Sequence, residues 1–273
     1  MAPGEHVKGQ PGQPKIKLYW LNASRSQRIA WLLEELGLDY DVELFQRTPD
    51  MRAPPDLRDV HPLGKAPVVS ISIPSAEKPL ILAESGFIVQ YLCDHFAQNS
   101  DLVPKRYRDS SHEGIVGGET DEWMRYQYFL HYAEGSLMPQ LLVGLILSIL
   151  KSPKIPIFIR PITSAVVDKL QAAYLAPEIS RHLDFLESQL ATSPRAGSYL
   201  CGPHLTAADI LLSFPLQLTK QRAGGLKVSK GEGKIVDKYP RAWEYLQRLE
   251  QEPGYKRAEA RIKKLLESKE QTS

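Results

Sequence analysis

Between residues 15 and 97 the chain alternates strand-type and helix-type patterns, and no other feature constrains the fold as strongly. Runs rich in β-forming residues occur at 15–21, 40–45, 67–73 and 79–83. A helical repeat of apolar residues lies between the first two runs and ends at Gly37, as helices with a C-terminal glycine do. A second helical repeat, at 83–96, is expected to present one face made of Phe87, Ile88, Tyr91 and Leu92. This order of elements predicts a small α/β domain.

After residue 118 the pattern becomes helical. Helices are expected at about 119–151, 164–191, 207–221, 241–251 and 255–268. The segment 98–118 is polar and contains Gly and Ser, which is typical of a linker. We therefore expect an α/β domain at 15–97 and an all-α domain at 119–268. The remaining segments are a tail at 1–14, expected to be disordered because it is polar and rich in Gly and Pro, a tail at 269–273, and a Gly- and Lys-rich loop at 222–238 without an assigned role.

Composition excludes several classes of protein. The formal net charge is only +2 and no zinc-finger or RNA-binding signature is present, so no nucleic-acid partner is expected. Cys93 and Cys201 are far apart in sequence, which indicates a reduced, cytoplasmic protein without a disulfide framework or a metal site. The first residues have no apolar core, so no signal peptide is expected.

The apolar run at 137–150 requires a choice between a membrane span and a core helix. It is shorter than the roughly 18–20 residues that cross a bilayer, and it contains Pro139 and Gln140. We therefore expect a buried core helix and no transmembrane segment.

Ser24 stands where the first strand gives way to the first helix. The spacing S-R-S-Q fits a capping box, in which Ser24 caps the helix and Gln27 reaches back. A hydroxyl has one donor and two acceptor lone pairs, so capping would leave its O–H available to a ligand. A helix N-terminus also stabilises a thiolate. No cysteine is nearby in the sequence, so such a thiolate would belong to the ligand; a purely structural cap is the alternative.

Two further stretches each allow a structural and a ligand-binding interpretation. In HPLGKAPVV, Pro67 either is the first residue of a strand or follows a cis bond that turns an edge outward and leaves the Ala66 backbone free to pair with a peptide-like ligand. In AESGFIVQYL, Ser85 either caps a helix or binds a carboxylate while Glu84 binds an ammonium group. The residues leave these alternatives open, but the order of all three stretches within one small α/β unit favours a ligand site.

In this order the motifs resemble those of the glutathione S-transferase family. They are S-R-S-x-R, H-P-x-G-K-x-P, E-S-G-x-I and, in the helical part, L-T-A-A-D-I. The resemblance extends from about Lys15 to about Lys264 and is strongest to a fungal cytosolic-type branch, through stretches such as NASRSQRIAWLLEELGL, MRAPPDL, ILAESGFI, YAEGSLMPQL and ADILLSFPLQ. It implies a thioredoxin-like N-terminal domain with a glutathione site, an α-helical C-terminal domain and a homodimer. Thr206 and Asp209 match the family's helix-capping box, which implies a folding role.

The resemblance also assigns roles around the glutathione sulfur. Ser24 is the candidate catalytic residue that activates the thiol, with Asn22 and Arg25 as alternative donors at the same junction. Ala66, where the family often has valine, would pair through its backbone with the cysteinyl unit beside a cis-Pro67. Branches of the family that depend on a cysteine carry it at the position of Ser24, so their thiol-transfer chemistry is not expected here.

The remaining implied contacts lie at the two ends of glutathione and at the second substrate. Glu84 and Ser85 would hold the γ-glutamyl end, and Lys65 and Arg52 would contact the glycyl carboxylate. The candidates for the second-substrate site, for which core packing is the alternative, are Tyr128, His131 and Tyr132. Glutathione is expected as a co-substrate, with no permanently bound cofactor and no metal.

The expected reaction is attack by the glutathione thiolate on small hydrophobic electrophiles or hydroperoxides, in detoxification and in the response to oxidative stress. A non-catalytic binding or regulatory protein that keeps the fold and the glutathione site is the alternative.

Overall fold

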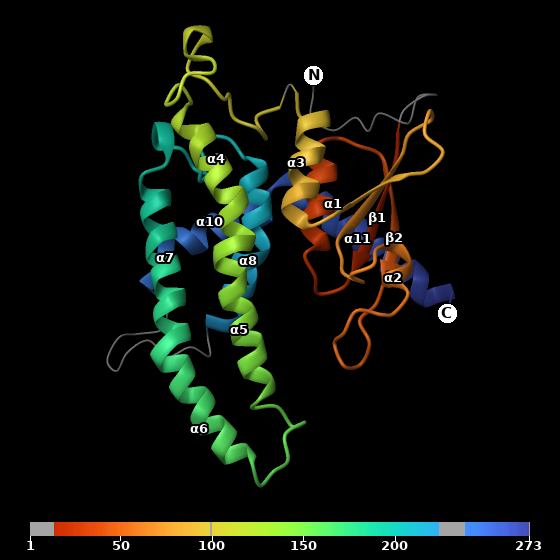
Figure 1. The fold of residues 1–273 in the computed structure, drawn as a ribbon, viewed down its shortest axis with the longest axis vertical. Helices are drawn as coiled ribbons and strands as arrows, with labels where there is room; N and C mark the ends of the chain where they lie inside the picture. Colours follow the sequence, from red (N-terminus) through yellow and green to blue (C-terminus); the bar gives the residue numbers. More distant parts are fainter. Residues whose placement is uncertain (1–13, 99, 224–237, 273) are drawn as a thin grey trace. The chain divides into compact units, whose positions relative to one another are not determined.

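The computed structural model describes residues 14–98, 100–223 and 238–272, and Figure 1 shows their fold. By their contacts these residues form two units. Unit 1 contains the described residues up to Val103 and those from Leu249 onward, and unit 2 runs from Pro104 to Arg248. The predicted tail at 1–14 and the predicted loop at 222–238 lie almost wholly outside the described residues.

Unit 1 is built on a four-stranded mixed sheet with the order β2-β1-β3-β4. The strands are β1 (Lys15–Leu21), β2 (Tyr40–Phe45), β3 (Val68–Ser72) and β4 (Leu80–Ala83). β1 pairs in parallel with β2, as a crossover through a helix allows, and antiparallel with β3, which pairs antiparallel with β4. The predicted strands and the thioredoxin-like arrangement are confirmed.

The helices that follow β1, β2 and β4 are α1 (Ser26–Glu35), α2 (Leu57–Val60) and α3 (Ser85–Phe96). α1 ends as predicted, because Gly37 adopts a φ of +64° that most residues avoid. The N–H groups of Gly37 and Leu38 bond to the carbonyls of Glu34 and Leu33 at 3.3 and 3.0 Å. This pair of bonds is a Schellman motif, which satisfies carbonyls at the end of the helix.

The buried face of α3 differs from the predicted one. Phe87 is 53% exposed, although it was expected to share a face with Ile88 and Leu92. The apolar side chains that α3 does bury are Ile88, Val89, Leu92 and Cys93. The buried face is therefore rotated by about one position from the predicted face, and neighbouring apolar residues in the sequence gave no means of choosing between the two.

The last helix, α11 (Pro253–Thr272), packs on α1 within unit 1. The indole ring of Trp31 meets the ring of Tyr255 edge to face, with 5.3 Å between the ring centroids. The Arg257 guanidinium also donates to the Glu34 carbonyl at 3.1 Å. Apolar contact and backbone hydrogen bonding therefore both hold α11 on α1.

A buried carboxylate lies at the centre of this contact. Glu34 is 4% exposed, and its two oxygens lie 3.4 Å from Arg257 Nε and 3.6 Å from Arg261 Nη1. The Tyr40 hydroxyl donates to the same carboxylate at 3.0 Å, and the Arg261 guanidinium lies 3.9 Å from the centroid of the Tyr40 ring. Burial and the nearby Glu34 charge raise the pKa of Tyr40, so its hydroxyl stays a donor. Glu34 thus joins α1, β2 and α11.

The grouping of α11 differs from the division made on the sequence. There the segment 255–268 was assigned to the all-α domain and 269–273 to a tail, whereas the structure groups α11 with the sheet and continues it to Thr272. Helical periodicity identifies the apolar face of a helix but not the element against which that face packs. The partner of α11 could therefore be found only in three dimensions.

Unit 2 is helical. It contains two long helices, each continuous through a π-helical turn: α4 (Asp121–Tyr132), η2 (Ala133–Leu137) and α5 (Met138–Ile149), then α6 (Arg160–Leu170), η3 (Gln171–Leu175) and α7 (Ala176–Ala191). The other elements are α8 (Ala207–Ala223), α10 (Pro240–Gln251), which ends beyond the unit boundary, and the 3-10 turns η1 (Ser110–His112) and η4 (Pro194–Ala196). The predicted helices of this part are confirmed, with ends shifted by a few residues.

The two π-helical turns have a common cause. Pro139 follows η2 and Pro177 follows η3, each near the start of the next helical segment. Proline has no N–H, and its ring clashes with the carbonyl four residues earlier in an α-helix. A wider turn at that place relieves the clash, so each long helix continues through its proline.

The apolar run at 137–150 is only partly buried, which corrects the expectation of a core helix. Leu141 and Leu147 are buried, but Leu142, Ile146 and Ile149 are 42, 60 and 50% exposed. Within the described residues, the helix Asp121–Ile149 alone has the length and apolar composition of a membrane span, and 33% of its most apolar window is buried. Core helices meet the same criteria, so these properties do not assign it to a membrane.

At the start of α8, the half of the predicted capping box in which the Asp209 side chain bonds back to the Thr206 N–H is confirmed. Asp209 is fully buried, and its Oδ2 accepts hydrogen bonds from the N–H and the hydroxyl of Thr206 at 2.8 and 2.6 Å. Its Oδ1 accepts from the Leu200 N–H at 3.1 Å and from the Tyr245 hydroxyl at 2.6 Å. Burial raises the pKa of Asp209, and these donors act in the opposite direction. The carboxylate thus joins the start of α8 to α10 and to the segment before it.

Replacing Glu34 with leucine is expected to lower the free energy of unfolding of unit 1 by about 1–3 kcal/mol, because the two arginines and the Tyr40 hydroxyl lose a buried partner. Glu259→Gln, at an exposed position of α11, is the matched control and should change it by less than about 0.5 kcal/mol. Denaturant midpoints and amide hydrogen exchange along α11 measure the effect. Equal midpoints for the two variants would mean that α11 is held without this carboxylate.

Candidate functional site

One end of the sheet collects the site candidates that lie in unit 1. Tyr19 of β1 pairs with Val68 of β3, and Val68 pairs with Ala83 of β4. Leu21, the last residue of β1, pairs with Phe45, the last residue of β2. β1, β2 and β4 therefore end where β3 begins. The segments next to these strand ends, which carry the candidates, are 22–25, 46–52, 65–67 and 84–85.

Ser24, the predicted catalytic residue, belongs to a hydrogen-bonded ring with Leu21 and Ser26. Its hydroxyl donates to the Leu21 carbonyl at 2.7 Å, accepts from the Ser26 N–H at 3.1 Å and lies 2.9 Å from Ser26 Oγ. Because the Ser24 proton points to Leu21, the Ser26 hydroxyl is the donor between the two side chains. Ser26 Oγ in turn accepts from the Leu21 N–H at 3.3 Å. The ring fastens the end of β1 to the start of α1.

The capping box predicted for Ser24 and Gln27 is wrong. α1 begins at Ser26, its N-cap residue is Arg25, and no side chain caps this position. Ser24 lies one residue too early, so its oxygen bonds the N–H two residues ahead, as in a serine turn. The O–H that a cap would leave free is bonded to Leu21 instead.

Arg47, which the sequence analysis missed, holds this junction from the segment after β2. Its backbone N–H donates to Asn22 Oδ1 at 2.7 Å, and its guanidinium donates to the carbonyls of Asn22, Ala23 and Met51 at 3.1, 3.1 and 2.9 Å. Ala23 and Met51 have φ angles of 46° and 61°, so Arg47 bonds the carbonyls of two left-handed residues. Burial, and then the charge of Arg25, lowers the pKa of Arg47. Arg47 was missed because an arginine that follows a strand matches no sequence motif for holding a neighbouring junction.

The alternative donors differ in their surroundings. Asn22 Oδ1 accepts a backbone N–H, which fixes the orientation of the amide, and Nδ2 makes no hydrogen bond within the residues that the structure describes. Asn22 therefore offers a donor at the end of β1. Arg25 is the N-cap residue of α1, at the positive end of the helix.

The Ala66–Pro67 peptide bond is cis, as the resemblance implied. Pro67 is buried, whereas Ala66 is half-buried. Neither the N–H nor the C=O of Ala66 makes a backbone hydrogen bond to another described residue. Ala66 lies two residues before Val68, the first residue of β3, so its backbone groups stand beyond the paired part of the sheet and can bond to an extended peptide.

Glu84 and Ser85 lie at the start of α3. Glu84 is exposed, and as the N-cap residue it has φ 68° and ψ 119°, a backbone conformation that is rare for a residue with a side chain. Ser85 is only 4% exposed, and its hydroxyl makes no hydrogen bond to the rest of the described chain. A positive φ outside glycine costs about 1–3 kcal/mol, and such residues cluster at binding sites.

Lys65 and Arg52 are both exposed, and within the described ranges neither charged group forms an ion pair. The backbone of Arg52 is held by Thr48, whose hydroxyl accepts the Arg52 N–H at 3.2 Å and whose N–H donates to the Arg52 carbonyl at 3.0 Å. The two cations therefore lie beside the same end of the sheet, and that of Arg52 stands on a backbone held by hydrogen bonds.

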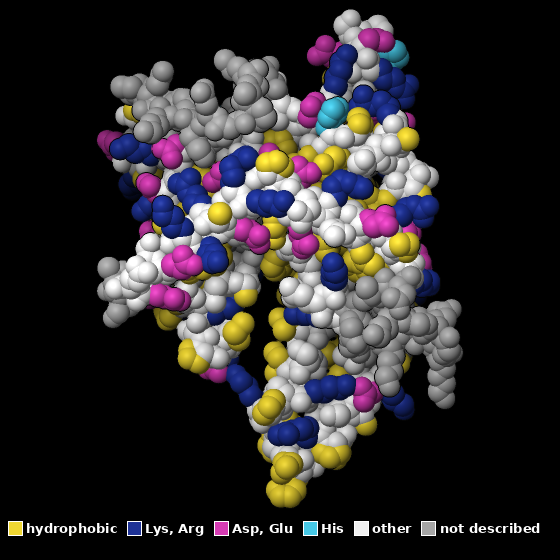
Figure 2. Space-filling view, turned by 180° about the vertical axis from the view of Figure 1, so that it is seen from behind, with side chains coloured by type: hydrophobic (Ala, Val, Ile, Leu, Met, Phe, Trp, Pro, Cys, Tyr) yellow, Lys and Arg dark blue, Asp and Glu magenta, His cyan; other side chains and the backbone are white. Residues whose placement is uncertain are grey.

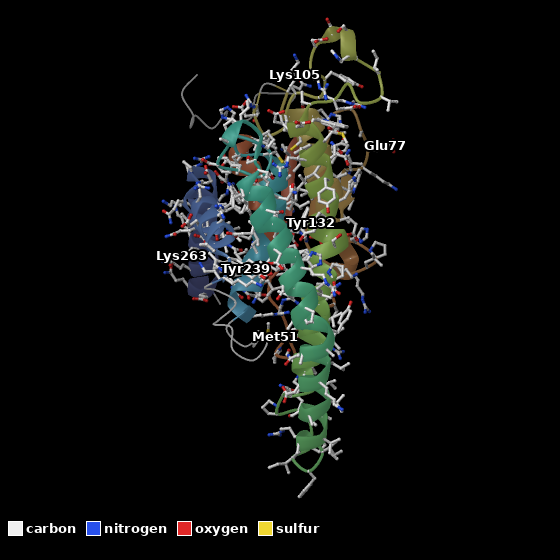
Figure 3. The ribbon with its side chains drawn as sticks, turned by 90° about the vertical axis from the view of Figure 1, so that its left-hand side faces the viewer. Met51, Glu77, Lys105, Tyr132, Tyr239 and Lys263 are labelled. Atoms are coloured by element: carbon white, nitrogen blue, oxygen red, sulfur yellow. The ribbon has the colours of Figure 1, made fainter. Side chains whose placement is uncertain are left out.

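The candidates for the second substrate lie in unit 2. Tyr132 is 4% exposed, and its hydroxyl lies 2.8 Å from His182 Nδ1 on α7; Figure 3 labels this tyrosine on α4. Burial raises the pKa of Tyr132 and lowers that of His182. Tyr128 stacks on Tyr132 with 5.8 Å between the ring centroids but is 52% exposed, and His131 is exposed. Tyr132 is thus a core residue, as the alternative interpretation held, while the other two present surface.

Replacing Glu84 by glycine and by alanine should separate backbone strain from side-chain contacts. Both variants lose the carboxylate, but only glycine adopts the observed φ without strain, so Glu84→Gly should be more stable than Glu84→Ala by about 1 kcal/mol. Thermal or denaturant unfolding measures the difference. Equal stability would mean that the positive φ at Glu84 carries no energetic cost.

Two family models match the chain. They are "Glutathione S-transferase, N-terminal domain" at residues 24–95 and "Glutathione S-transferase, C-terminal domain" at residues 168–248. The first match covers most of unit 1, including the segments around Ser24, Ala66 and Glu84. The second begins near the end of α6 and covers η3, α7, α8 and most of α10.

Two curated proteins and one solved structure that are similar to this chain carry the same family name. Glutathione S-transferase 1 of Saccharomyces cerevisiae is 38% identical over 77% of this chain and 82% of its own length. Glutathione S-transferase 3 of Schizosaccharomyces pombe is 32% identical over 74% and 73%. A solved glutathione S-transferase from Actinobacillus pleuropneumoniae superposes with a TM-score of 0.65 at 30% identity, over 90% of this chain and 92% of that one. The chain belongs to the glutathione S-transferase family.

Proposed function

We propose that this protein stabilises the thiolate of bound glutathione and directs it at small hydrophobic electrophiles or hydroperoxides. The observation that carries the proposal is the set of polar groups at one end of the sheet that have no partner among the described residues. Ala66 offers backbone groups, Ser85 a hydroxyl, and Lys65 and Arg52 cations. Glutathione carries a peptide unit, two carboxylates and an ammonium group, and Glu84 supplies the anion that the ammonium requires. Donors, acceptors and charges are thus complementary.

The proposed orientation follows from this complementarity. The cysteinyl unit pairs with the Ala66 backbone, which places the sulfur toward the junction between β1 and α1. The γ-glutamyl carboxylate binds Ser85 and the start of α3, and its ammonium group binds Glu84. The glycyl carboxylate binds Lys65 and Arg52.

We assign the hydrogen bond at the sulfur to Ser24, whose O–H exchanges its bond to the Leu21 carbonyl for a bond to the thiolate. A thiolate is a charged acceptor, and hydrogen bonds to charged acceptors are roughly twice as strong as neutral ones. Rotation about the Cβ–Oγ bond turns the Ser24 proton from the Leu21 carbonyl to the sulfur, while the bonds from Ser26 to Ser24 Oγ remain. The Asn22 amide, which needs no exchange, is the competing donor.

The energy required is modest. A free thiol has a pKa of about 8.5, so only about 3% is ionised at pH 7. Lowering this pKa by about two units takes ~2.7 kcal/mol of preferential thiolate stabilisation. One charge-assisted hydrogen bond and the N-terminal end of α1 together supply energy of this order.

Two reactions follow from the same thiolate. With a chloronitroaromatic compound, the sulfur forms a bond to the ring carbon and chloride leaves with the bonding pair. With a hydroperoxide, the sulfur attacks oxygen, the O–O bond breaks, and a second glutathione yields glutathione disulfide, water and an alcohol. Roles in detoxification and oxidative stress, a homodimer and a cytoplasmic location remain predictions from the family.

Ser24→Ala is expected to lower kcat for conjugation by about ten- to a hundredfold, with the KM for glutathione within a few-fold, because the lost bond is stronger to the thiolate than to the thiol. The pH profile of kcat should shift upward by about one unit, so that activity partly recovers near pH 9. Steady-state kinetics between pH 6 and about 9.5 measure both effects.

Ser26→Ala is the matched control. Ser26 is fully buried and belongs to the same ring, so its loss weakens the ring without removing a donor to the ligand. This variant should keep kcat within about threefold and keep the wild-type pH profile. Equal losses in the two serine variants would reduce Ser24 to a structural role. Asn22→Asp keeps the acceptor for Arg47 and removes the amide donor; loss of activity in this variant alone would assign the donor to Asn22.

A transferase and a non-catalytic glutathione-binding protein are separated by comparing retention with turnover. The wild-type chain should bind a glutathione affinity column and also conjugate 1-chloro-2,4-dinitrobenzene or reduce cumene hydroperoxide. Glu84→Gln should weaken retention by about tenfold, because a charged hydrogen bond to the ammonium group is lost. Retention of the wild type without turnover on a panel of electrophiles and hydroperoxides would favour the binding protein.

A further inference from the structure

Exposed apolar side chains gather on the hairpin formed by α5, the following turn and α6. Phe158 is 90% exposed, Ile157 and Ile162 are 66% exposed, and Ile146 is 60% exposed. We call the exposed apolar side chains of residues 142–174 the hairpin patch. Soluble proteins rarely leave such a contiguous surface uncovered without an interaction that uses it.

The hairpin patch is continuous along both helices. On α5 the exposed side chains recur at helical spacing from Leu142 to Ile149, and on α6 they recur every fourth residue from Ile162 to Leu170. The turn between the helices joins the two stripes through Ile157 and Phe158. Within unit 2 both helices run past the end of α8, so the turn lies at a protruding end (Figures 1 and 3). Figure 2 shows apolar side chains crowded at this end, with basic side chains beside them.

The charges beside the hairpin patch are predominantly positive. Between residues 142 and 174 the sequence contains Lys151, Lys154, Arg160 and Lys169 but a single acidic residue, Asp168, which gives a net charge of +3 (four minus one). Asp168 is paired with Lys151. The Arg160 guanidinium donates to backbone carbonyls of the turn at 3.0 and 3.3 Å, so its charge is not neutralised by a carboxylate there.

We propose that the hairpin patch docks on the surface of a bilayer that contains anionic phospholipids. Apolar side chains at a protruding turn can enter the boundary between headgroups and acyl chains, while the flanking cations stay at the level of the phosphates. Each cation near an anionic surface strengthens binding by about fivefold. The docking is peripheral, because α4, the first part of the same long helix, packs against α8 within unit 2.

A second copy of the chain fits this surface less well. A two-fold contact brings the same patch of both copies together, which here places a net charge of +3 against an equal charge. An anionic bilayer instead complements the charge, and it accommodates a protruding apolar turn that has no matching groove. Docking does not depend on the proposed glutathione chemistry, and its test needs no turnover.

The test is flotation of the full chain with vesicles of phosphatidylcholine alone and of phosphatidylcholine with about 30% phosphatidylserine. Binding to the anionic vesicles should be at least about tenfold tighter and should weaken between about 0.05 and 0.5 M salt. Ile157→Ser with Phe158→Ser should reduce binding at least tenfold, because two apolar anchors are lost. The matched control is Ile115→Ser with Val116→Ser, at side chains that are 55 and 101% exposed elsewhere in unit 2 and should leave binding unchanged.

Lys154→Glu with Lys169→Glu tests the electrostatic part separately, and it should abolish the preference for anionic vesicles. The proposal is overturned if the wild type does not bind anionic vesicles or if both serine pairs bind as the wild type does. The alternative, in which a second copy of the chain covers the hairpin patch, is tested by the oligomeric state, measured by light scattering without vesicles. If Ile157→Ser with Phe158→Ser turns a dimer into a monomer, the hairpin patch is an interface between copies of the chain and the proposal is wrong.

Discussion

The pairing of β1 on both of its edges is the constraint on which the candidate site depends. β1 is parallel to β2 and antiparallel to β3, so the ends of three strands and the beginning of a fourth meet at one end of the sheet. Side chains alternate between the two faces of a strand, and a shift of one residue in this pairing would exchange those faces. The groups around Ser24, Ala66 and Glu84 would then no longer adjoin one another. Backbone hydrogen bonds therefore position the site before any side chain acts.

Features with local causes were predictable from the sequence, and features that depend on distant partners were not. Gly37 ends α1 through its own φ, and Asp209 caps α8 from three residues away, so both were recognised as motifs. The Ser24 hydroxyl, by contrast, bonds a carbonyl whose direction is set by the end of β1. The same holds for α11 and for the outer part of α5: periodicity predicted the helices correctly, but whether an apolar face is covered depends on the elements beside it.

Charged groups have different surroundings in the two units. In unit 1 the buried carboxylate of Glu34 is surrounded by two arginines and a tyrosine hydroxyl, and this pairing holds a helix in place. Along the hairpin of unit 2 the cations outnumber the carboxylates and stand beside exposed apolar side chains. A transferase that docks through this hairpin would work next to the phase in which hydrophobic electrophiles and lipid hydroperoxides accumulate, which raises their local concentration without any change at the site.

Arg47 links two parts of the proposed site through hydrogen bonds to their backbones. It holds the residues before α1, where the sulfur is proposed to bind, and also Met51, next to the Arg52 cation proposed for the opposite end of the tripeptide. If glutathione binds as proposed, ordering of one part would lower the entropic cost of ordering the other. Fragments of glutathione that occupy only one end would forgo this cooperativity, and the intact tripeptide would then bind more tightly than the sum of the separate contacts of its pieces.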